Sequence, residues 1–205
     1  MKKKPNILII VADQQRYDCI GYAEQYPVKT PNIDKLADDG VWFSNAYTPI
    51  PICAPSRQAF LNGRRPETFG ALWNYGGGLE VSALSPKEYT WVRDLDKLGY
   101  SNSFIGKWAG HPQHGPMEYG FHHDVSLKEY GNFRSEKYPN LKYEREWMGE
   151  VDSVPYEDNV SHWLAAHASD QIKQYSKCDE PWHIRLDFPG PHLPCRPSKE
   201  FAELY

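Results

Sequence analysis

The 205-residue sequence predicts an α/β fold with a doubly wound, mostly parallel sheet sandwiched by helices. Three observations predict it: a continuous apolar run near the start, an alternation of strand-like and helix-like segments, and polar residues that gather where strands end. In such folds ligands bind at the carboxyl ends of the strands. The candidate site therefore falls in three segments, 13–18, 107–114 and 189–194.

The first predicted strand covers residues 6–13, NILIIVAD, an almost unbroken apolar run typical of a parallel strand covered on both faces. A helix is predicted next in TPNIDKLADDG, with Thr30 as its N-cap, Pro31 at its first position and a glycine as its stop. The segment 41–47, VWFSNAY, is predicted as a second strand.

The unit repeats in SPKEYTWVRDLDKLGY, residues 85–100. This segment predicts a helix with a capping box formed by Ser85 and Glu88, and with Gly99 as its stop. It leads into a predicted strand in SNSFIGKW, residues 101–108.

The last elements follow a long polar segment. Residues 110–157 are rich in Gly, Pro, His, Tyr and charge, and we expect them to form a long excursion over the sheet. A third amphipathic helix is predicted at 158–177 and a final strand in WHIRLDF, residues 182–188.

Composition excludes several classes of protein. Hydrophobic residues make up 40% and charged residues 24%, an ordinary globular mixture, and the net charge of −4 gives no reason to expect a nucleic-acid partner. No apolar stretch approaches the ~20 residues that cross a bilayer, so no membrane partner is expected.

No signal peptide is seen, which predicts a cytoplasmic protein, or a periplasmic or secreted one if a leader was removed. Four cysteines without CxxC spacing indicate neither a disulfide framework nor structural zinc.

One segment, PIPICAPSRQAFLNGRRP at 49–66, surrounds a cysteine with prolines and arginines. Pro51 and Pro55 stiffen the backbone on both sides of Cys53, and the helix-like SRQAFLNG follows. Cys53 is thereby expected near a helix N-terminus, which favours anions, and Arg57 adds a positive charge about one turn later. These residues alone leave two interpretations, a nucleophile for an anionic ester or a buried cysteine in a proline-rich loop.

The segment CAPSRQAFLNGR resembles the sulfatase signature, in which Cys-x-Pro-x-Arg precedes a short helix that ends in Gly-Arg. The matching residues are Cys53, Pro55, Arg57, Leu61, Gly63 and Arg64. In this family, part of the alkaline phosphatase-like superfamily, a sulfatase-maturing (formylglycine-generating) enzyme oxidises the cysteine to Cα-formylglycine. The resemblance implies a hydrated aldehyde: one hydroxyl attacks the sulfur of a sulfate ester, and the other lets the adduct collapse and release sulfate.

The resemblance extends to the first strand, whose terminal acidic pair binds a divalent cation in the family. Asp13 matches the first acid, whereas Gln14 stands where many members have a second Asp, with an amide oxygen that can still coordinate a cation. The implied metal ligands are Asp13, Gln14 and the modified Cys53, with Ca²⁺ expected ahead of Mg²⁺ or Mn²⁺. The alternative for Asp13 is a helix or turn cap, and Asp18 is expected to be structural.

Two further segments carry the resemblance. GYSNSFIGKW resembles the family's Gly-Lys-Trp-His segment, which implies that Lys107 binds the sulfate. Ala109 occupies the position of the family's histidine, so we expect His111, ahead of His114, to take the role of that histidine. FPGPHLPCRP resembles the family's Pro-His-x-Pro segment, which implies that His192 contacts the ester oxygen and protonates the leaving group. The alternatives are a loop histidine for His111 and a turn histidine for His192.

The implied function is hydrolysis of the sulfate monoester of a small molecule or saccharide. The expected catalytic residues are Cys53, Arg57, Lys107, His111 and His192. A phosphonate monoester or phosphodiester hydrolase of the same superfamily remains an alternative because Ala109 replaces the histidine. A cysteine phosphatase needs an arginine six residues after the cysteine, where Ala59 stands. A non-catalytic binding module that kept the fold is the alternative of a different class.

Sulfatases of this kind run well beyond twice the length of this sequence. Residues 1–205 are therefore expected to be the amino-terminal part of a catalytic domain, whose sheet is incomplete here. The family's later metal ligands and a further lysine that binds sulfate follow beyond the matching region. We expect this part alone to bind metal weakly and to be inactive.

Overall fold

The structure is a computed structural model that describes residues 4–145 and 147–204, and it divides into two compact units. One unit contains the chain up to Asp13 and again from Pro49 onward, and the other contains residues 14–48. Each unit is described by itself below.

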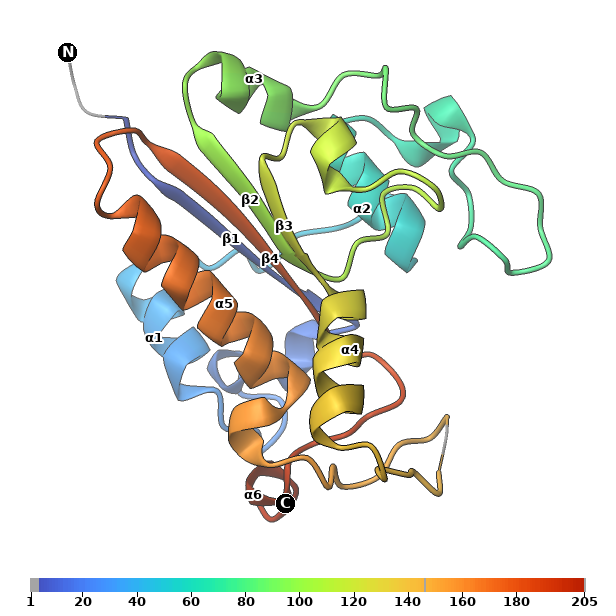
Figure 1. Cartoon of the computed structure of the whole chain (residues 1–205), viewed down its shortest axis with the longest axis vertical. Helices are drawn as coiled ribbons and strands as arrows, with labels where there is room; N and C mark the ends of the chain where they lie inside the picture. The colour runs from blue at the N-terminus through green and yellow to red at the C-terminus, as the bar shows by residue number, and fades with distance from the viewer. Residues whose placement is uncertain (1–3, 146, 205) are drawn as a thin grey trace. The chain divides into compact units, whose positions relative to one another are not determined.

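The larger unit contains a four-stranded parallel sheet, which confirms the predicted α/β fold class (Figure 1). Its strands lie in the order β1-β4-β2-β3. Their bounds are β1 Ile7–Asp13, β2 Ser101–Gly106, β3 His123–Ser126 and β4 Trp182–Pro191. The last strand along the chain is therefore inserted between the first two, as expected of a sheet built through crossover connections.

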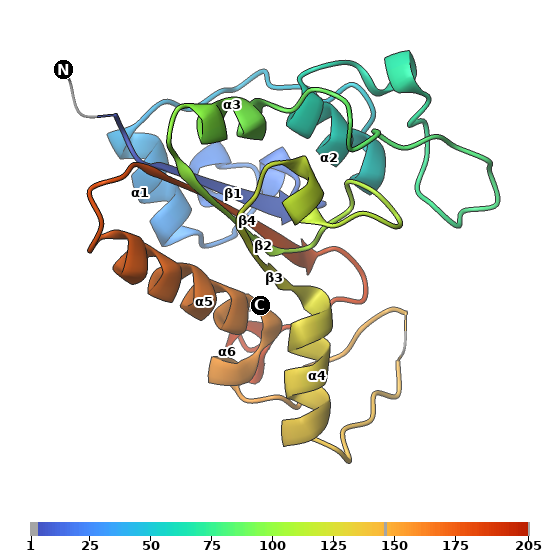
Figure 2. The same cartoon turned by 45° about the horizontal axis from the view of Figure 1, so that its top comes forward.

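Helices of the larger unit lie on both faces of the sheet (Figure 2), so the sheet is doubly wound. Each face has its own apolar core. Helices α2 (Cys53–Asn62) and α3 (Trp91–Lys97) contribute to the core on one face, which contains Leu61, Leu84, Val92, Phe104, Tyr119 and Phe121. Helix α5 (Val160–Tyr175) covers the other face, with a core of Ile105, Val125, Leu164, Ala168, Ile184 and Leu186. Phe104 and Ile105 are neighbours on β2 and point to opposite cores, as the strand period of two requires.

The larger unit contains further helices. Helix α4 (Leu127–Lys137) begins with a capping box in which Ser126 Oγ accepts from Glu129 N and the Glu129 carboxylate accepts from Ser126 N. The other helices are η3 Pro66–Phe69, η4 Pro116–Tyr119, η5 Tyr156–Asp158 and α6 Lys199–Ala202. No helix among the described residues is long and apolar enough to span a membrane. The cysteines Cys19, Cys53, Cys178 and Cys195 carry free thiols.

The smaller unit contains the predicted helix α1 and two single turns. Their bounds are η1 Tyr17–Cys19, η2 Gly21–Ala23 and α1 Pro31–Asp39. Thr30 is the N-cap residue, but its hydroxyl accepts from Gly21 N at 2.8 Å and donates to Asp34 Oδ1 at 2.7 Å instead of capping the helix backbone. These two hydrogen bonds hold the loop before α1 against the first turn of the helix.

The predicted strand at 41–47 is wrong. The segment forms no strand, and Val41, Phe43 and Tyr47 are 75%, 74% and 90% exposed. A strand needs a partner for its backbone N–H and C=O groups. No strand in the described part of the chain pairs with residues 41–47. β1 is also covered less than expected, because Leu8 is 43% and Ile10 is 55% exposed on this strand at the sheet edge.

Two further expectations fail in detail. Ser85 and Glu88 form a turn, in which Glu88 N donates to Ser85 O, and α3 begins only at Trp91 after its N-cap Thr90. The predicted capping box is therefore wrong, although Gly99, with φ +81°, ends the helical segment as predicted. The segment 110–157 is more than an excursion, because it supplies β3 and α4.

Gly106 ends β2 with φ +110° and closely approaches β4: a Cβ there would lie 2.1 Å from the carbonyl oxygen of Asp187. We expect Gly106→Ala to lower the free energy of unfolding by about 2–4 kcal/mol, because it adds a clash to a strained φ. Gly99→Ala is the matched control, since its φ is +81° but nothing lies within 4 Å of its added Cβ. Urea unfolding measures both, and an equal loss in the two variants would contradict the close approach.

His183 lies on β4, fully buried, with its ring centroid 5.0 Å from that of Trp91 and 5.8 Å from that of Phe121. Its Nδ1 contacts Asn102 Oδ1 at 3.1 Å, and its Nε2 has no hydrogen-bond partner in the described part of the chain. Burial, with a smaller contribution from the charge of Arg185, lowers the pKa of His183 to about 4. The imidazole is therefore neutral in the folded protein.

Because the folded pKa of His183 is below its unfolded value of about 6.5, its contribution to stability is complete above pH 6.5 and falls as the pH drops toward 4. We expect this single residue to reduce the free energy of unfolding by about 3 kcal/mol over that window. In His183→Asn the pH dependence of urea midpoints should become shallower there. An unchanged slope would show that His183 is not buried neutral.

Candidate active site

Three strands end at one edge of the sheet and place the candidate side chains beside one another. The register pairs Asp187 of β4 with Val11 of β1 on one side and with Gly106 of β2 on the other. Asp13 closes β1 and Lys107 follows β2, and Lys107 N donates to the Asp187 carbonyl at 2.8 Å. Residues from three distant parts of the sequence therefore meet at the carboxyl edge of the sheet, as the fold class predicts.

Cys53 is the first residue of α2, at the helix N-terminus that the sequence predicted. The helix start is held by Asn74, whose Oδ1 accepts from Ala54 N at 2.9 Å. The Cys53 thiol is half-buried; its Sγ lies 3.5 Å from Asp13 Oδ1 and 3.7 Å from Lys107 Nζ. The helix end and the lysine together supply positive potential at the sulfur, where an anion or an anionic nucleophile is stabilised.

Arg57, one turn along α2, joins two carboxylates that come from different strands. Its NH2 group donates to Asp13 Oδ2 at 3.2 Å, and its NH1 group donates to Asp187 Oδ2 and to the carbonyl of Lys107, the latter at 3.2 Å. A planar guanidinium can reach both carboxylates at once, which a lysine ammonium cannot. Arg57 thereby fixes α2, and with it Cys53, against the edge of the sheet.

A second arginine completes this buried chain of charges. Arg185 Nε and NH2 donate to the two oxygens of Asp187, each at 2.9 Å. The exposed fractions are 6% for Asp13, 6% for Arg57, 2% for Arg185 and 0% for Asp187. Charges this deeply buried are stable only when paired, so removing any member leaves another uncompensated. With Lys107, the group contains three cations and two carboxylates and can accept one further negative charge.

Asp13 contacts most of the site. Lys107 Nζ lies 2.5 Å from its Oδ2, and Arg57 and Cys53 supply its other contacts. Burial by itself would raise the pKa of Asp13, but the hydrogen bond and charge of Lys107 and the charge of Arg57 together lower it below its ordinary value. Asp13 is therefore an ionised carboxylate at neutral pH.

His192 lies in the loop region that follows the paired part of β4, between the cis peptide bonds Gly190–Pro191 and Leu193–Pro194. Its Nδ1 contacts the Leu193 carbonyl oxygen at 2.5 Å, an arrangement in which Nδ1–H is the donor. The other ring nitrogen, Nε2, is then the one able to exchange a proton. Ligand atoms of His192, Asp13 and Cys53 all lie within 4.8 Å of one another.

This cluster fits a divalent cation in part. Asp13 supplies an ionised carboxylate, and His192 and Cys53 supply a nitrogen and a sulfur within reach of the same point. Ca²⁺ takes six to eight oxygen ligands, so one carboxylate can only begin such a site. An oxygen in place of the Cys53 sulfur would make the donor set harder and better suited to Ca²⁺ or Mg²⁺.

One predicted residue, His111, does not belong to this cluster in the described part of the chain. His111 Nδ1 accepts from Gln113 N at 3.0 Å and from His114 N at 3.2 Å, and in the described residues the group formed by Asp13, Cys53 and His192 does not include it. Burial and the neighbouring His114 lower the pKa of His111, so it is a neutral acceptor within its own loop. Gln14 belongs to the smaller unit, with φ +63°, and its metal role stays a prediction.

Sequence reasoning missed Asp187, Arg185 and Asn74. A signal for the first two was present in WHIRLDF: two charged residues, two positions apart, on one face of an otherwise apolar strand. Buried charges of opposite sign need partners, so this spacing indicated an ion-pair network. For Asn74 the sequence carries no comparable signal, since it lies in a loop with turn-forming glycines.

Curated relatives of known name match nearly the whole chain. The arylsulfatase of Clostridium perfringens (strain 13 / Type A) is 29% identical over 230 residues, which cover 98% of this chain and 46% of that protein. The N-acetylgalactosamine-6-sulfatase of Homo sapiens is 29% identical over 96% of this chain and 41% of its own length. The chain thus spans less than half the length of these relatives.

Solved structures share the fold. The crystal structure of Ps i-CgsB superposes with a TM-score of 0.73 at 28% identity, covering 93% of this chain and 46% of that one. The phosphonate monoester hydrolase of Agrobacterium radiobacter superposes with a TM-score of 0.76 at 22% identity, covering 98% and 44%, a likeness of fold alone.

A model of one protein family accounts for almost the entire chain. The family described as Sulfatase matches residues 5–205, and this range contains Asp13, Cys53, Arg57, Lys107 and His192. The curated relatives named above carry sulfatase names as well. This chain belongs to the sulfatase family.

Proposed function

We propose that this chain carries the nucleophile of a sulfuric ester hydrolase that cleaves a sulfate monoester. Its nucleophile is Cys53 after conversion to formylglycine by a sulfatase-maturing enzyme. The observation that carries the proposal is the position of Cys53: Sγ lies at a helix N-terminus, 3.5 Å from Asp13 Oδ1 and 3.7 Å from Lys107 Nζ. Formylglycine supplies a hydroxyl nucleophile that can later be released by carbon–oxygen cleavage.

Lys107 and Arg57 provide the charge that a sulfate ester requires. The Lys107 ammonium is 20% exposed, so it can contact a bound ligand, whereas the Arg57 guanidinium is held inside by Asp13 and Asp187. We therefore assign Lys107 to the sulfate oxygens and Arg57 to the positioning of Asp13 and α2. Fixed donors of this kind stabilise charge that develops on oxygen in the transition state.

His192 is the proton donor in this proposal. Its Nδ1–H is occupied by the Leu193 carbonyl, which holds the ring and leaves Nε2 for the substrate. His192 also belongs to the same cluster as Cys53 and Asp13. A protonated imidazole can donate its Nε2 proton to an alcohol as it leaves sulfur.

Asp13 would hold a divalent cation, Ca²⁺ by the family resemblance, together with the oxygen that replaces the Cys53 sulfur and with donors outside the described cluster. The cation would supply positive charge beside the sulfate. Asp13 is prepared for this role because Lys107 and Arg57 keep its carboxylate ionised.

A saccharide sulfate is the proposed substrate class. Among the structural relatives, one was solved with k-i-k-neocarrahexaose and another with D-glucosamine-2-N,6-O-disulfate. The second candidate function is hydrolysis of a phosphonate monoester, favoured by Ala109 at the position of the family's histidine and by the fold shared with the Agrobacterium enzyme.

Rates on matched esters test the proposal. The complete, matured protein should hydrolyse 4-nitrophenyl sulfate with a higher kcat/KM than the 4-nitrophenyl ester of phenylphosphonate. Cys53→Ala should lower both rates by about 10⁴-fold or more, because it removes the nucleophile. A higher kcat/KM on the phosphonate would assign the second function. Equal rates in wild type and Cys53→Ala would contradict both.

Lys107→Met removes one charge at nearly constant volume. We expect kcat/KM on 4-nitrophenyl sulfate to fall about 100- to 1,000-fold, because the sulfate loses a fixed cation. Lys128→Met is the control, since Lys128 is an exposed residue of α4 outside the cluster, and it should retain wild-type kcat/KM. Similar losses in both variants would indicate a general effect of net charge instead of a contact at Lys107.

A further inference from the structure

The ends of β1 and β4 and the start of α2 bring three kinds of metal ligand to one point. Asp13 supplies a carboxylate, Cys53 a thiol and His192 an imidazole, and their ligand atoms all lie within 4.8 Å of one another. The character of this donor set depends on the chemical state of Cys53. A sulfur ligand is soft and suits zinc, whereas the hydroxyl oxygens of formylglycine are hard and suit calcium or magnesium.

The oxygen of Asp13 and the sulfur of Cys53 already have the separation that a tetrahedral zinc ion requires. Asp13 Oδ1 lies 3.5 Å from Cys53 Sγ. Zinc binds sulfur at about 2.3 Å and carboxylate oxygen at about 2.0–2.2 Å, so a tetrahedral ion holds these two atoms about 3.5–3.7 Å apart. Neither α2 nor β1 has to move to bring both ligands onto one ion.

The carboxylate of Asp13 is fixed with one oxygen turned toward the sulfur. Its Oδ2 contacts Lys107 Nζ at 2.5 Å and accepts from the NH2 group of Arg57 at 3.2 Å. The side chain is 6% exposed, so these donors hold it in a buried position. Hydrogen bonds to one oxygen of a carboxylate orient the other for a metal ion. Oδ1, the oxygen nearest Cys53, is therefore the ligand atom.

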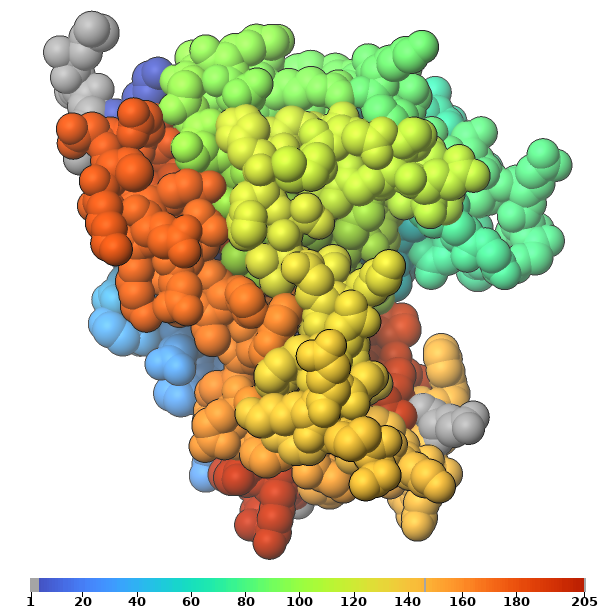
Figure 3. Space-filling view, in the orientation of Figure 1, coloured from blue at the N-terminus to red at the C-terminus, as the bar shows by residue number. Residues whose placement is uncertain are grey.

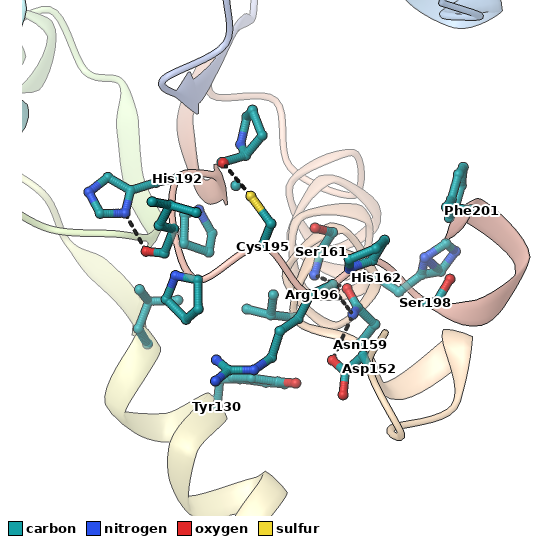
Figure 4. A pocket seen from close by; sticks show the side chains of 18 of the residues that line it. Tyr130, Asp152, Asn159, Ser161, His162, His192, Cys195, Arg196, Ser198 and Phe201 are labelled. Carbon is teal, nitrogen blue, oxygen red and sulfur yellow. Dashed lines mark hydrogen bonds between the residues drawn. The ribbon is translucent and has the colours of Figure 1, made fainter. Parts of the chain in front are cut away.

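His192 has the hydrogen bond that a zinc-binding histidine needs. Its Nδ1 contacts the Leu193 carbonyl oxygen at 2.5 Å, and Figure 4 shows the ring held by this bond. The carbonyl accepts the Nδ1 proton, so Nε2 carries the lone pair. Histidines that bind metal ions almost always donate their other N–H to a carbonyl, a carboxylate or water in this way.

A cavity of about 760 Å³ reaches this group from one side. Lys107 and His192 line it, together with residues of α4 and of the loop after β4. The space-filling view places α4, in yellow, at the surface beside residues of that loop, in red (Figure 3). Three protein ligands leave the fourth position of a tetrahedral zinc ion to water, and the cavity gives the ion and its water a path to His192.

We propose that Asp13, Cys53 and His192 bind one zinc ion while Cys53 is an unmodified thiol. Zinc binding displaces the thiol proton to water, and the thiolate and the Asp13 carboxylate together balance the charge of the ion. Conversion of Cys53 to formylglycine removes the sulfur, so the same position then favours a hard cation. The zinc site belongs to the protein before maturation and goes beyond the proposed function, because no ester hydrolysis is involved in it.

Cobalt binding tests the site in the complete protein, made in a host without a sulfatase-maturing enzyme so that Cys53 stays a thiol. The intact mass confirms the thiol. Co²⁺ replaces Zn²⁺ in tetrahedral sites and gives a sulfur-to-cobalt charge-transfer band in the near ultraviolet only when a thiolate binds it. We expect this band to saturate at one Co²⁺ per chain and to vanish on addition of one equivalent of Zn²⁺, which binds more tightly.

Cys53→Ser should abolish the band. His192→Ala should lower the affinity for Zn²⁺, measured against a chelating dye, by at least about 100-fold, because losing a ligand costs more than losing one of its outer partners. Lys107→Met should bind Zn²⁺ more tightly than wild type, since the Lys107 ammonium lies 3.7 Å from Cys53 Sγ and repels the ion. Cys195→Ala is the matched control, because Cys195 is an exposed free thiol close to His192 in sequence and outside the group. It should keep both the band and the affinity.

The spectrum of the unconverted wild-type protein decides the question even where a variant fails to fold. Absence of a thiolate band there would overturn the site. A band that survives in folded Cys53→Ser, a band lost in Cys195→Ala, or weaker binding by Lys107→Met would place the ion elsewhere and overturn it as well. Ester hydrolysis by the matured protein judges the proposed function separately, so either can fail without the other.

Discussion

The buried contact of Arg57 with Asp13 and Asp187 is the interaction on which the rest of the site depends. It joins α2 to the ends of β1 and β4, two strands whose register already brings Asp13 and Asp187 to one edge. Burying such charges is costly unless each is paired, and here each carboxylate has a second cation, Lys107 or Arg185. The cost is offset only when helix and strands are all in place, so the network specifies the position of Cys53.

This arrangement gives the position of Cys53 two properties at once. Cys53 is beside positive charge, from the helix end and Lys107, and beside an ionised carboxylate, Asp13, which can hold a cation. Charges that are fixed before a ligand binds need no reorganisation when charge develops on it.

The sequence predicted the elements whose signals are local, and missed those that depend on distant partners. β1, α1, β2, α5 and β4 were predicted from apolar periodicity and caps, and Cys53 was predicted at a helix start from its flanking prolines. The segment 41–47 has strand composition but no partner among the described residues, so its composition was misleading. Ser85 and Glu88 have the spacing of a capping box, but the hydroxyl of Thr90, which donates to the Tyr119 carbonyl, belongs to the actual helix start. The contact between Arg57 and Asp187 joins residues 130 positions apart, and the sequence carries no local signal for a pairing over that separation.

The most direct test of this account is the mass of the peptide that contains Cys53, taken from protein made in its native host. Formylglycine at this position lowers the peptide mass by about 18 daltons relative to the unmodified cysteine. The account predicts that the lighter peptide is present and that its share of the total follows the sulfate-ester activity of the preparation. An intact thiol at Cys53 in protein that still hydrolyses sulfate esters would contradict it.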